Sequence, residues 1–69
     1  MDSFYSRDEL LDMGFRYVGD SVRISRKASF YSTSQIVIKD NSRIDDFVIL
    51  SGKIEIGRNV HISAYVGIF

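Results

Sequence analysis

The sequence predicts an all-β fold, a parallel β-helix of about two and a half triangular coils preceded by a short helix. The first observation is an aliphatic residue that recurs every six positions, at Ile44, Leu50, Ile56, Ile62 and Ile68. The second is a parallel column four places after the first, at Ser42, Val48, Ile54, Val60 and Val66. The third is the composition of the segments between these pairs, such as "KDN", "SGK" and "GRN", which are rich in Gly, Asn and Asp.

A coil of short strands explains this period of six. Residues two apart on a strand point to the same side, so the pairs from 36/38 to 66/68 face one interior. Gly, Asn and Asp tolerate the tight turns and positive φ that corners between strands need. An antiparallel domain rich in Ile and Val is the alternative. It is disfavoured because hairpin proteins have longer strands and irregular turns, whereas this phase holds from Ile36 to Ile68.

The chain divides into a helical cap, residues 1–21, and a β-helix, residues 22–69, that ends partway through a coil. Ser6 and Glu9 have the spacing of a capping box, and Gly14 is a plausible terminator, which predicts a helix over about 7–13. Such a helix would cover the exposed end of the coil. Two extra residues within "YSTSQ" (31–35) break the phase and predict a small loop or bulge.

The composition excludes several classes of function. Nine basic and nine acidic residues give a net charge of zero, so no overall field attracts nucleic acid or an anionic membrane. The absence of cysteine excludes disulfides, thiolate zinc sites and a cysteine nucleophile. The acidic, polar N-terminus is not a signal peptide, and no segment approaches the roughly 20 apolar residues of a membrane span. We therefore expect a cytoplasmic protein without membrane insertion.

The repeats, together with the leader "SFYSRDELLDMGFRYVGDSVRIS" (3–25), resemble the N-terminal half of the hexapeptide-repeat acyltransferases. The likeness is to the sugar O-acetyltransferases of capsule and lipopolysaccharide synthesis in particular. The segment "IGRNV" (56–60) fits the most typical form of the repeat, and "RIDDF" (43–47) narrows the subgroup. The resemblance implies a left-handed coil, which the periodicity alone does not establish, because crossovers between parallel strands are usually right-handed.

The same resemblance implies a homotrimer that binds acetyl-CoA as co-substrate between adjacent β-helices, without a metal. It also implies acetyl transfer to the hydroxyl or amine of a sugar or nucleotide-sugar acceptor in polysaccharide biosynthesis, with a histidine as general base. Neither the acceptor sugar nor the choice between oxygen and nitrogen follows from the sequence. The relatives carry further coils and a later catalytic histidine that this chain does not contain.

His61 is the only histidine and therefore the one imidazole that can be considered as a general base. It lies between the inward Val60 and Ile62, so we expect its side chain on an outer face, one coil above Arg43. A surface or subunit-interface role is favoured over catalysis, and no carboxylate is assigned to orient its ring. A single histidine does not make a metal site.

Asp45 and Asp46 form an adjacent acidic pair at a corner, and they are the candidates for binding the acceptor sugar. The simpler interpretation is that acidic residues suit solvated turns, because adjacent carboxylates diverge and do not easily share a proton. The residues that would bind the cofactor are not identified.

Two further surface features each allow a functional and a purely structural interpretation. Ile49 lies outward between two inward residues, which suggests a protein contact, although single exposed aliphatic residues are common. Arg23, Arg26 and Lys27 form a small basic cluster in the sequence that would suit phosphate groups, with a solvated corner as the favoured alternative.

The sequence thus predicts the N-terminal part of an acetyl-CoA-dependent sugar acetyltransferase that is inactive as these 69 residues alone. The alternative is a non-enzymatic, self-associating module built on a truncated transferase scaffold.

Overall fold

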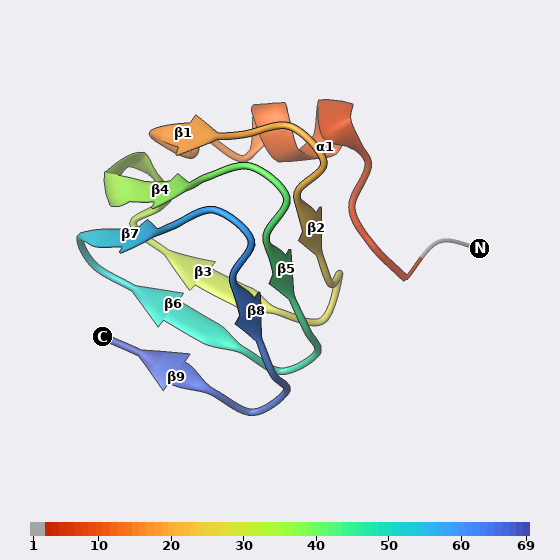
Figure 1. The fold of residues 1–69 in the computed structure, drawn as a ribbon. Coiled ribbons are helices and arrows are strands. Elements are labelled where there is room, and N and C mark those ends of the chain that lie inside the picture. The colour runs from red at the N-terminus through yellow and green to blue at the C-terminus, as the bar shows by residue number, and fades with distance from the viewer. Residues whose placement is uncertain (1–2) are drawn as a thin grey trace.

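The computed structural model describes residues 3–69 and shows a left-handed parallel β-helix with a short N-terminal helix (Figure 1). The fold class predicted from the repeats is therefore confirmed. The elements, in chain order, are α1 Arg7–Asp12, β1 Tyr17–Val18, β2 Arg23–Ile24, β3 Ser29–Tyr31, the 3-10 turn η1 Thr33–Gln35, β4 Ile36–Ile38, β5 Arg43–Ile44, β6 Ile49–Ser51, β7 Ile54–Ile56, β8 His61–Ile62 and β9 Gly67–Ile68.

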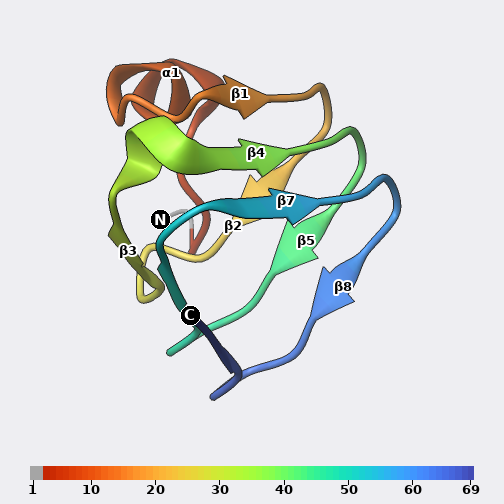
Figure 2. The same cartoon turned by 90° about the vertical axis from the view of Figure 1, so that its left-hand side faces the viewer.

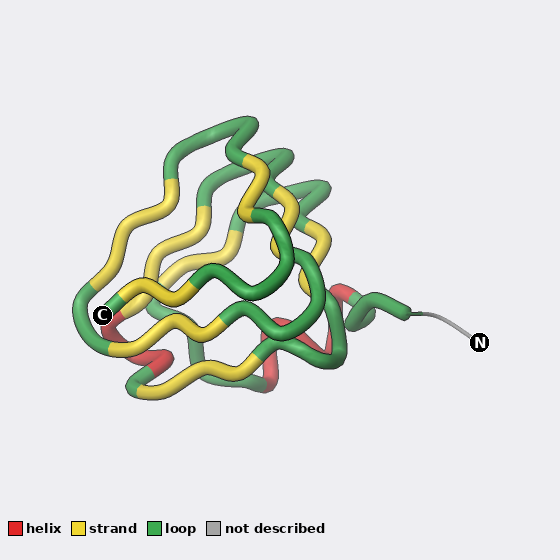
Figure 3. Tube along the Cα trace, turned by 90° about the horizontal axis from the view of Figure 1, so that it is seen from below, coloured by secondary structure: helices red, strands yellow, loops and turns green. Residues whose placement is uncertain are grey.

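Three parallel sheets of three strands form the walls of the coil, in the orders β1-β4-β7, β2-β5-β8 and β3-β6-β9. Figure 2 shows the first two sheets side by side, and Figure 3 shows the coils stacked along one axis. The chain thus makes three sets of three strands rather than about two and a half coils. The difference arises because β1 (Tyr17–Val18) belongs to the first coil and begins before residue 22, the expected start of the β-helix.

The register between coils confirms the predicted insertion. Ile24 pairs with Ile44, twenty positions later, whereas Ile44 pairs with Ile62, eighteen positions later. The two extra residues lie in the connection from β3 to β4, where Ser32 adopts a left-handed backbone (φ 61°) before η1. The first coil is therefore longer than the second, while the aliphatic columns stay aligned.

The aliphatic columns form one buried core, and Leu10 of α1 is part of it. Its fully buried members include residues from all three sheets: Ile24, Ile36, Ile38, Ile44, Val48 and Leu50. Ser42 occupies an inward position without disrupting this core, because its hydroxyl donates to the Gly57 carbonyl (2.7 Å) and accepts from the Val60 amide (3.0 Å). A buried hydroxyl that is hydrogen-bonded in this way avoids most of its desolvation penalty.

The corners between strands contain residues with positive φ. Asn41 (φ 63°) and Asn59 (φ 56°) occupy equivalent corners in successive coils, and the side-chain Nδ2 of Asn41 donates to Asn59 Oδ1 at 2.6 Å. Asparagine tolerates this conformation better than most residues. Phe47 and Tyr65 also have positive φ (62° and 68°), which is unusual for aromatic residues, and their rings stack with centroids 5.2 Å apart.

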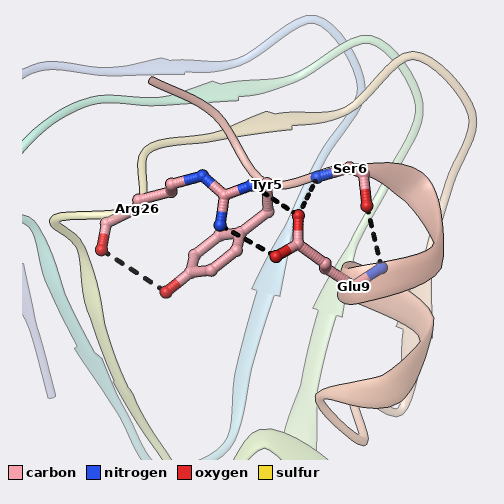
Figure 4. A network of polar contacts seen from close by, with 4 residues as sticks. All are labelled: Tyr5, Ser6, Glu9 and Arg26. Atoms are coloured by element: carbon pink, nitrogen blue, oxygen red, sulfur yellow. Dashed lines mark hydrogen bonds and ion pairs between the residues drawn. The ribbon is translucent and has the colours of Figure 1, made fainter. Parts of the chain in front are cut away.

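Helix α1 is capped as its sequence predicts, and Figure 4 shows the contacts. Ser6 Oγ accepts from the Glu9 amide (3.2 Å), and Glu9 Oε1 accepts from the Ser6 amide (2.8 Å), which completes a capping box. The Glu9 carboxylate also accepts two hydrogen bonds from Arg26, at 2.6 and 2.8 Å. The helix ends at Asp12 with Met13 as its C-cap, close to the expected end at residue 13.

The segment before α1 also joins the first coil. Phe4 forms an isolated antiparallel bridge with Ser25, and the Tyr5 amide donates to the Ile24 carbonyl at 3.0 Å. The Arg26 amide donates to the Ser3 carbonyl at 3.0 Å. The leader therefore pairs with strand β2 (Arg23–Ile24), and the helix lies over the first coil (Figure 1). No helix within residues 3–69 is long and apolar enough to cross a membrane.

The contact between Glu9 and Arg26 predicts a specific loss of stability in acid. The Arg26 hydrogen bonds, followed by the Ser6 amide, lower the pKa of Glu9 from 4.5 to about 2. A carboxylate whose pKa is lower in the folded state than in the unfolded state stabilises the fold at pH values above its unfolded-state pKa. This stabilisation is lost as the pH falls toward and through its folded-state pKa. We expect the melting temperature, followed by circular dichroism, to fall between pH 4.5 and about 2 more steeply in the wild type than in Glu9→Gln.

Asp8→Asn is the matched control, because Asp8 lies in the same first turn. This variant keeps the contact between Glu9 and Arg26, so it should retain the loss of stability in acid that this contact causes. If the melting temperatures of Glu9→Gln and the wild type fell equally with pH over this range, the loss of stability in acid could not be attributed to Glu9.

Candidate functional site

The outer face of the sheet β2-β5-β8 brings together the charged residues that the sequence singles out. His61 lies in β8 directly opposite Arg43 in β5, and its side chain is 54% exposed. The alternation along the strand explains this, since Ile62 beside it is buried in the core. The expectation that His61 points outward, one coil above Arg43, is confirmed.

Asp45 links these two residues. Its Oδ2 lies 2.7 Å from His61 Nε2, and its Oδ1 accepts a hydrogen bond from Arg43 Nε at 2.8 Å. The hydrogen bond with His61, followed by that from Arg43, lowers the pKa of Asp45 below its usual value, so this group is a carboxylate at neutral pH. The assignment of no carboxylate to His61 is therefore wrong. Asp45 follows β5 at a corner, and stacking of the next coil places His61 beside it.

Asp46 points to a different partner from Asp45. Its Oδ1 accepts a hydrogen bond from the hydroxyl of Ser25, which is buried and also accepts from the Lys27 amide at 3.0 Å. The two adjacent carboxylates therefore diverge, as expected, and they do not share a proton. Asp46 ties the second coil to the first, while Asp45 ties it to the third.

A surface hollow of about 370 Å³ lies beside these carboxylates, lined by Ser3, Phe4, Arg43, Asp45, Asp46 and Ala64. The guanidinium of Arg43 lies 5.7 Å from the centre of the Phe4 ring, so the leader forms part of its wall. Carboxylate oxygens and a guanidinium beside an aromatic ring can hydrogen-bond a polyhydroxylated molecule and pack against its apolar face. The placement of Phe4 beside this hollow depends on the antiparallel bridge to Ser25, which no sequence pattern reveals.

The pair of His61 and Asp45 has the geometry of an imidazole oriented by a carboxylate. With Nε2 hydrogen-bonded to Asp45, the ring leaves Nδ1 for another partner. A neutral imidazole in this tautomer accepts a proton at Nδ1, which is the property of a general base. The ring is more than half exposed, however, and no described wall excludes water from it.

The basic residues that are close in the sequence do not form one cluster. Arg26 contacts Glu9, and the Lys27 ammonium lies 5.7 Å from the centre of the Phe47 ring. Arg23 lies in β2, opposite Arg43. Ile49 is outward and 38% exposed, opposite Gly67 of the next coil, and its proposed protein contact stays a prediction.

A second hollow, of about 580 Å³, lies over β4 and β7, on a different sheet from His61. It is lined by Arg16, Gln35, Val37, Lys53, Ile54 and Glu55. Within residues 3–69, no group of three or more His, Cys, Asp or Glu side chains is placed to hold a metal ion. The stacked rings of Phe47 and Tyr65 are a further feature that sequence reasoning missed, although their eighteen-residue spacing matches one coil.

Comparison with known proteins gives consistent results. A family model described as bacterial transferase hexapeptide (six repeats) matches residues 35–69. A curated Escherichia coli protein, dTDP-4-amino-4,6-dideoxy-D-glucose acyltransferase, is 48% identical over 63 residues, which cover 87% of this chain and 33% of the relative.

Solved structures of AntD, an N-acyltransferase from Bacillus cereus, also match. The complex with dTDP and 3-hydroxybutyryl-CoA superimposes with a TM-score of 0.93 at 55% identity and covers 97% of this chain and 36% of AntD. A variant of AntD in complex with dTDP-4-amino-4,6-dideoxyglucose and Coenzyme A gives the same values. The chain thus spans about a third of the length of the relatives it matches.

Proposed function

The chain belongs to the bacterial transferase hexapeptide family, and from this we propose that it is the N-terminal part of an acyl-CoA-dependent sugar acyltransferase. The acceptor that we propose is an amino sugar carried on a nucleoside diphosphate. One observation carries the proposal: the superposition on AntD, an N-acyltransferase in complex with dTDP and 3-hydroxybutyryl-CoA, over 97% of this chain at 55% identity.

The comparisons favour nitrogen over oxygen as the acylated atom. AntD is described as an N-acyltransferase, and the Escherichia coli relative is named for a 4-amino sugar. The sequence resemblance to O-acetyltransferases left this choice open. We further propose an acyl-CoA donor without restriction to acetyl, a trimeric assembly, a cytoplasmic location and a role in making sugars for polysaccharides.

We assign the hollow of about 370 Å³ beside Asp45 and Asp46 to the acceptor sugar. Amine acylation forms a C–N bond, breaks the C–S bond of the thioester, and moves one proton overall from the amine to the departing sulfur of CoA. His61 is a positioning residue in this proposal rather than the base. Its ring is open to water, and through Nε2 it contacts Asp45, which lines the hollow.

A non-enzymatic, self-associating module is the second candidate function. Exposed apolar side chains at and beside strand β6 favour it, because Phe47 is 47% exposed and Ile49 38% exposed. Exposed apolar surface of this kind is typical of contacts between chains.

We expect the purified 69-residue chain to show no acyl transfer above background with acyl-CoA and a dTDP-linked amino sugar. Catalysis requires donor, acceptor and base to be held within fractions of an ångström. The hollow beside Asp45 is an open surface feature in the described residues. AntD, assayed in parallel, is the positive control. Turnover by the isolated chain that His61→Ala abolishes without unfolding would contradict both the expected inactivity and the positioning role of His61.

A chimera tests the proposed function itself. This chain would replace the segment of AntD on which it superimposes, and the product would be identified by mass spectrometry. The same chimera carrying Leu50→Ala, which disrupts the core, is the negative control. Acylated nucleotide sugar supports the enzyme. A folded, assembled chimera without product supports the non-enzymatic module.

A further inference from the structure

Basic side chains face one another across the outer face of the sheet β2-β5-β8. Arg23 of β2 lies directly opposite Arg43 of β5, and Arg43 lies directly opposite His61 of β8. Like charges directly opposite on neighbouring strands destabilise a sheet. The chain as a whole has no net charge, so this row does not follow from a general excess of basic residues.

Among the described residues, a carboxylate offsets the positive charge only at the end of this row formed by Arg43 and His61. Asp45 accepts from Arg43 Nε and contacts His61, as described above. The Arg23 side chain has no hydrogen-bonded or ionic partner in the part of the chain that the structure describes. The positive end of the row is therefore the pair formed by Arg23 and the terminal nitrogens of Arg43.

A surface hollow of about 210 Å³ lies between these two arginines, lined by Ser21, Arg23, Asn41, Ser42 and Arg43. It is smaller than the roughly 300–1,000 Å³ of pockets that hold whole ligands, so it suits one charged group. Ser21 and Asn41 have positive φ (57° and 63°) at the corners that border it. The Ser42 hydroxyl is already engaged with Gly57 and Val60, which leaves the guanidinium groups as the strong donors.

We propose that Arg23 and Arg43 bind a diphosphate group in this hollow. A guanidinium presents a planar fork of donors that matches phosphate oxygens and can bind them in a bidentate manner. A dianion between the two arginines removes the repulsion that their pairing creates. The chain retains this unfavourable pairing because the bound ligand neutralises it.

The position of the hollow indicates which diphosphate occupies it. Arg43 also lines the hollow of about 370 Å³ that contains Asp45 and Asp46. A sugar in that hollow and its diphosphate in the smaller one would lie on either side of the same guanidinium. The ligand class is therefore a nucleoside diphosphate linked to the acceptor sugar. This identification rests on the proposed function, whereas the diphosphate site itself does not.

Titration with inorganic pyrophosphate, followed by NMR, tests the site. We expect shifts of the Arg23 and Arg43 amide signals, and about tenfold weaker binding by Arg23→Gln, since one charge-assisted hydrogen bond corresponds to roughly that factor. Arg58→Gln, which removes the same charge from the exposed corner 57–59, should bind as the wild type does. Unchanged binding by Arg23→Gln, or an equal loss in Arg58→Gln, would overturn the proposal.

Thermal unfolding gives a readout that a purely structural arginine would not reproduce. Without pyrophosphate, Arg23→Gln should melt at or above the temperature of the wild type, because it removes a like-charged neighbour of Arg43. At the same concentration, pyrophosphate should raise the melting temperature of the wild type more than that of Arg23→Gln. A lower melting temperature for Arg23→Gln without ligand would contradict the proposal.

Nucleotides distinguish the two sources of diphosphate, the acceptor and CoA. We expect dTDP to compete with pyrophosphate and to bind about tenfold more weakly to Arg23→Gln, with no such effect on CoA. Binding of dTDP that does not depend on Arg23 would overturn the site and leave the proposed function standing. Arg23-dependent binding of pyrophosphate without binding of dTDP would support the site and count against the proposed acceptor.

Discussion

Leu50→Ala should destabilise the chain by about 2–5 kcal/mol, which is enough to unfold most of a domain this small. Leu50 is fully buried at the centre of the aliphatic column, between Phe30 of the first coil and Ile68 of the third. Its truncation removes apolar contacts and leaves a cavity that rigid neighbouring coils cannot fill. Urea unfolding followed by circular dichroism measures the loss directly.

Ile49→Ala is the matched control, because it makes a similar truncation at the adjacent position of the same strand. Ile49 points outward and is 38% exposed, so its loss should change the free energy of unfolding by no more than about 0.5 kcal/mol. Losses of equal size in the two variants would contradict the inward and outward assignment of β6.

Gly19→Ala should also destabilise the fold, by about 1–3 kcal/mol. Gly19 lies at the corner after β1, where Asp40 of the next coil packs against it. A Cβ at this position would lie 2.7 Å from the backbone nitrogen of Asp40. Asp40 cannot move away freely, because its Oδ1 accepts from the Asp20 amide at 3.0 Å. The addition of one methyl group therefore forces two coils apart.

Gly57→Ala provides the control for this effect. Gly57 follows β7 as Gly19 follows β1, but the nearest atom to an added Cβ is Val60 Cγ2 at 3.8 Å, an ordinary contact. The change should be neutral or raise stability by about 0.4–1 kcal/mol, because alanine restricts the unfolded chain. Thermal unfolding of the two variants compares them. Equal destabilisation would indicate that glycine is needed at this corner for another reason.

The backbone architecture could be predicted because its determinants repeat along the sequence. The six-residue spacing of Ile44, Leu50, Ile56 and Ile62 defines the interior, and a phase break within "YSTSQ" (31–35) locates the insertion. The capping box of Ser6 and Glu9 is equally local. The prediction began the β-helix at residue 22 and so left β1 out of the first coil. A strand with a single inward aliphatic residue, Val18, is too short to show the repeat.

The candidate site could be predicted only in part. The position of His61 above Arg43 follows from coil length, but its contact with Asp45 depends on how a corner side chain turns toward the next coil. The bond between Ser25 and Asp46 spans two coils in the same way. These contacts join residues sixteen or more positions apart and have no periodic pattern to reveal them.

The initial rate of amine acylation by the chimera of this chain with AntD tests the proposed function most directly. A segment that folds as its AntD counterpart and supplies the acceptor site should give kcat/KM within about tenfold of AntD, a loss of roughly 1.4 kcal/mol in transition-state stabilisation. Acylated dTDP-linked amino sugar formed at that rate is the result we predict. A folded chimera whose kcat/KM is more than about a thousandfold below that of AntD would contradict the account.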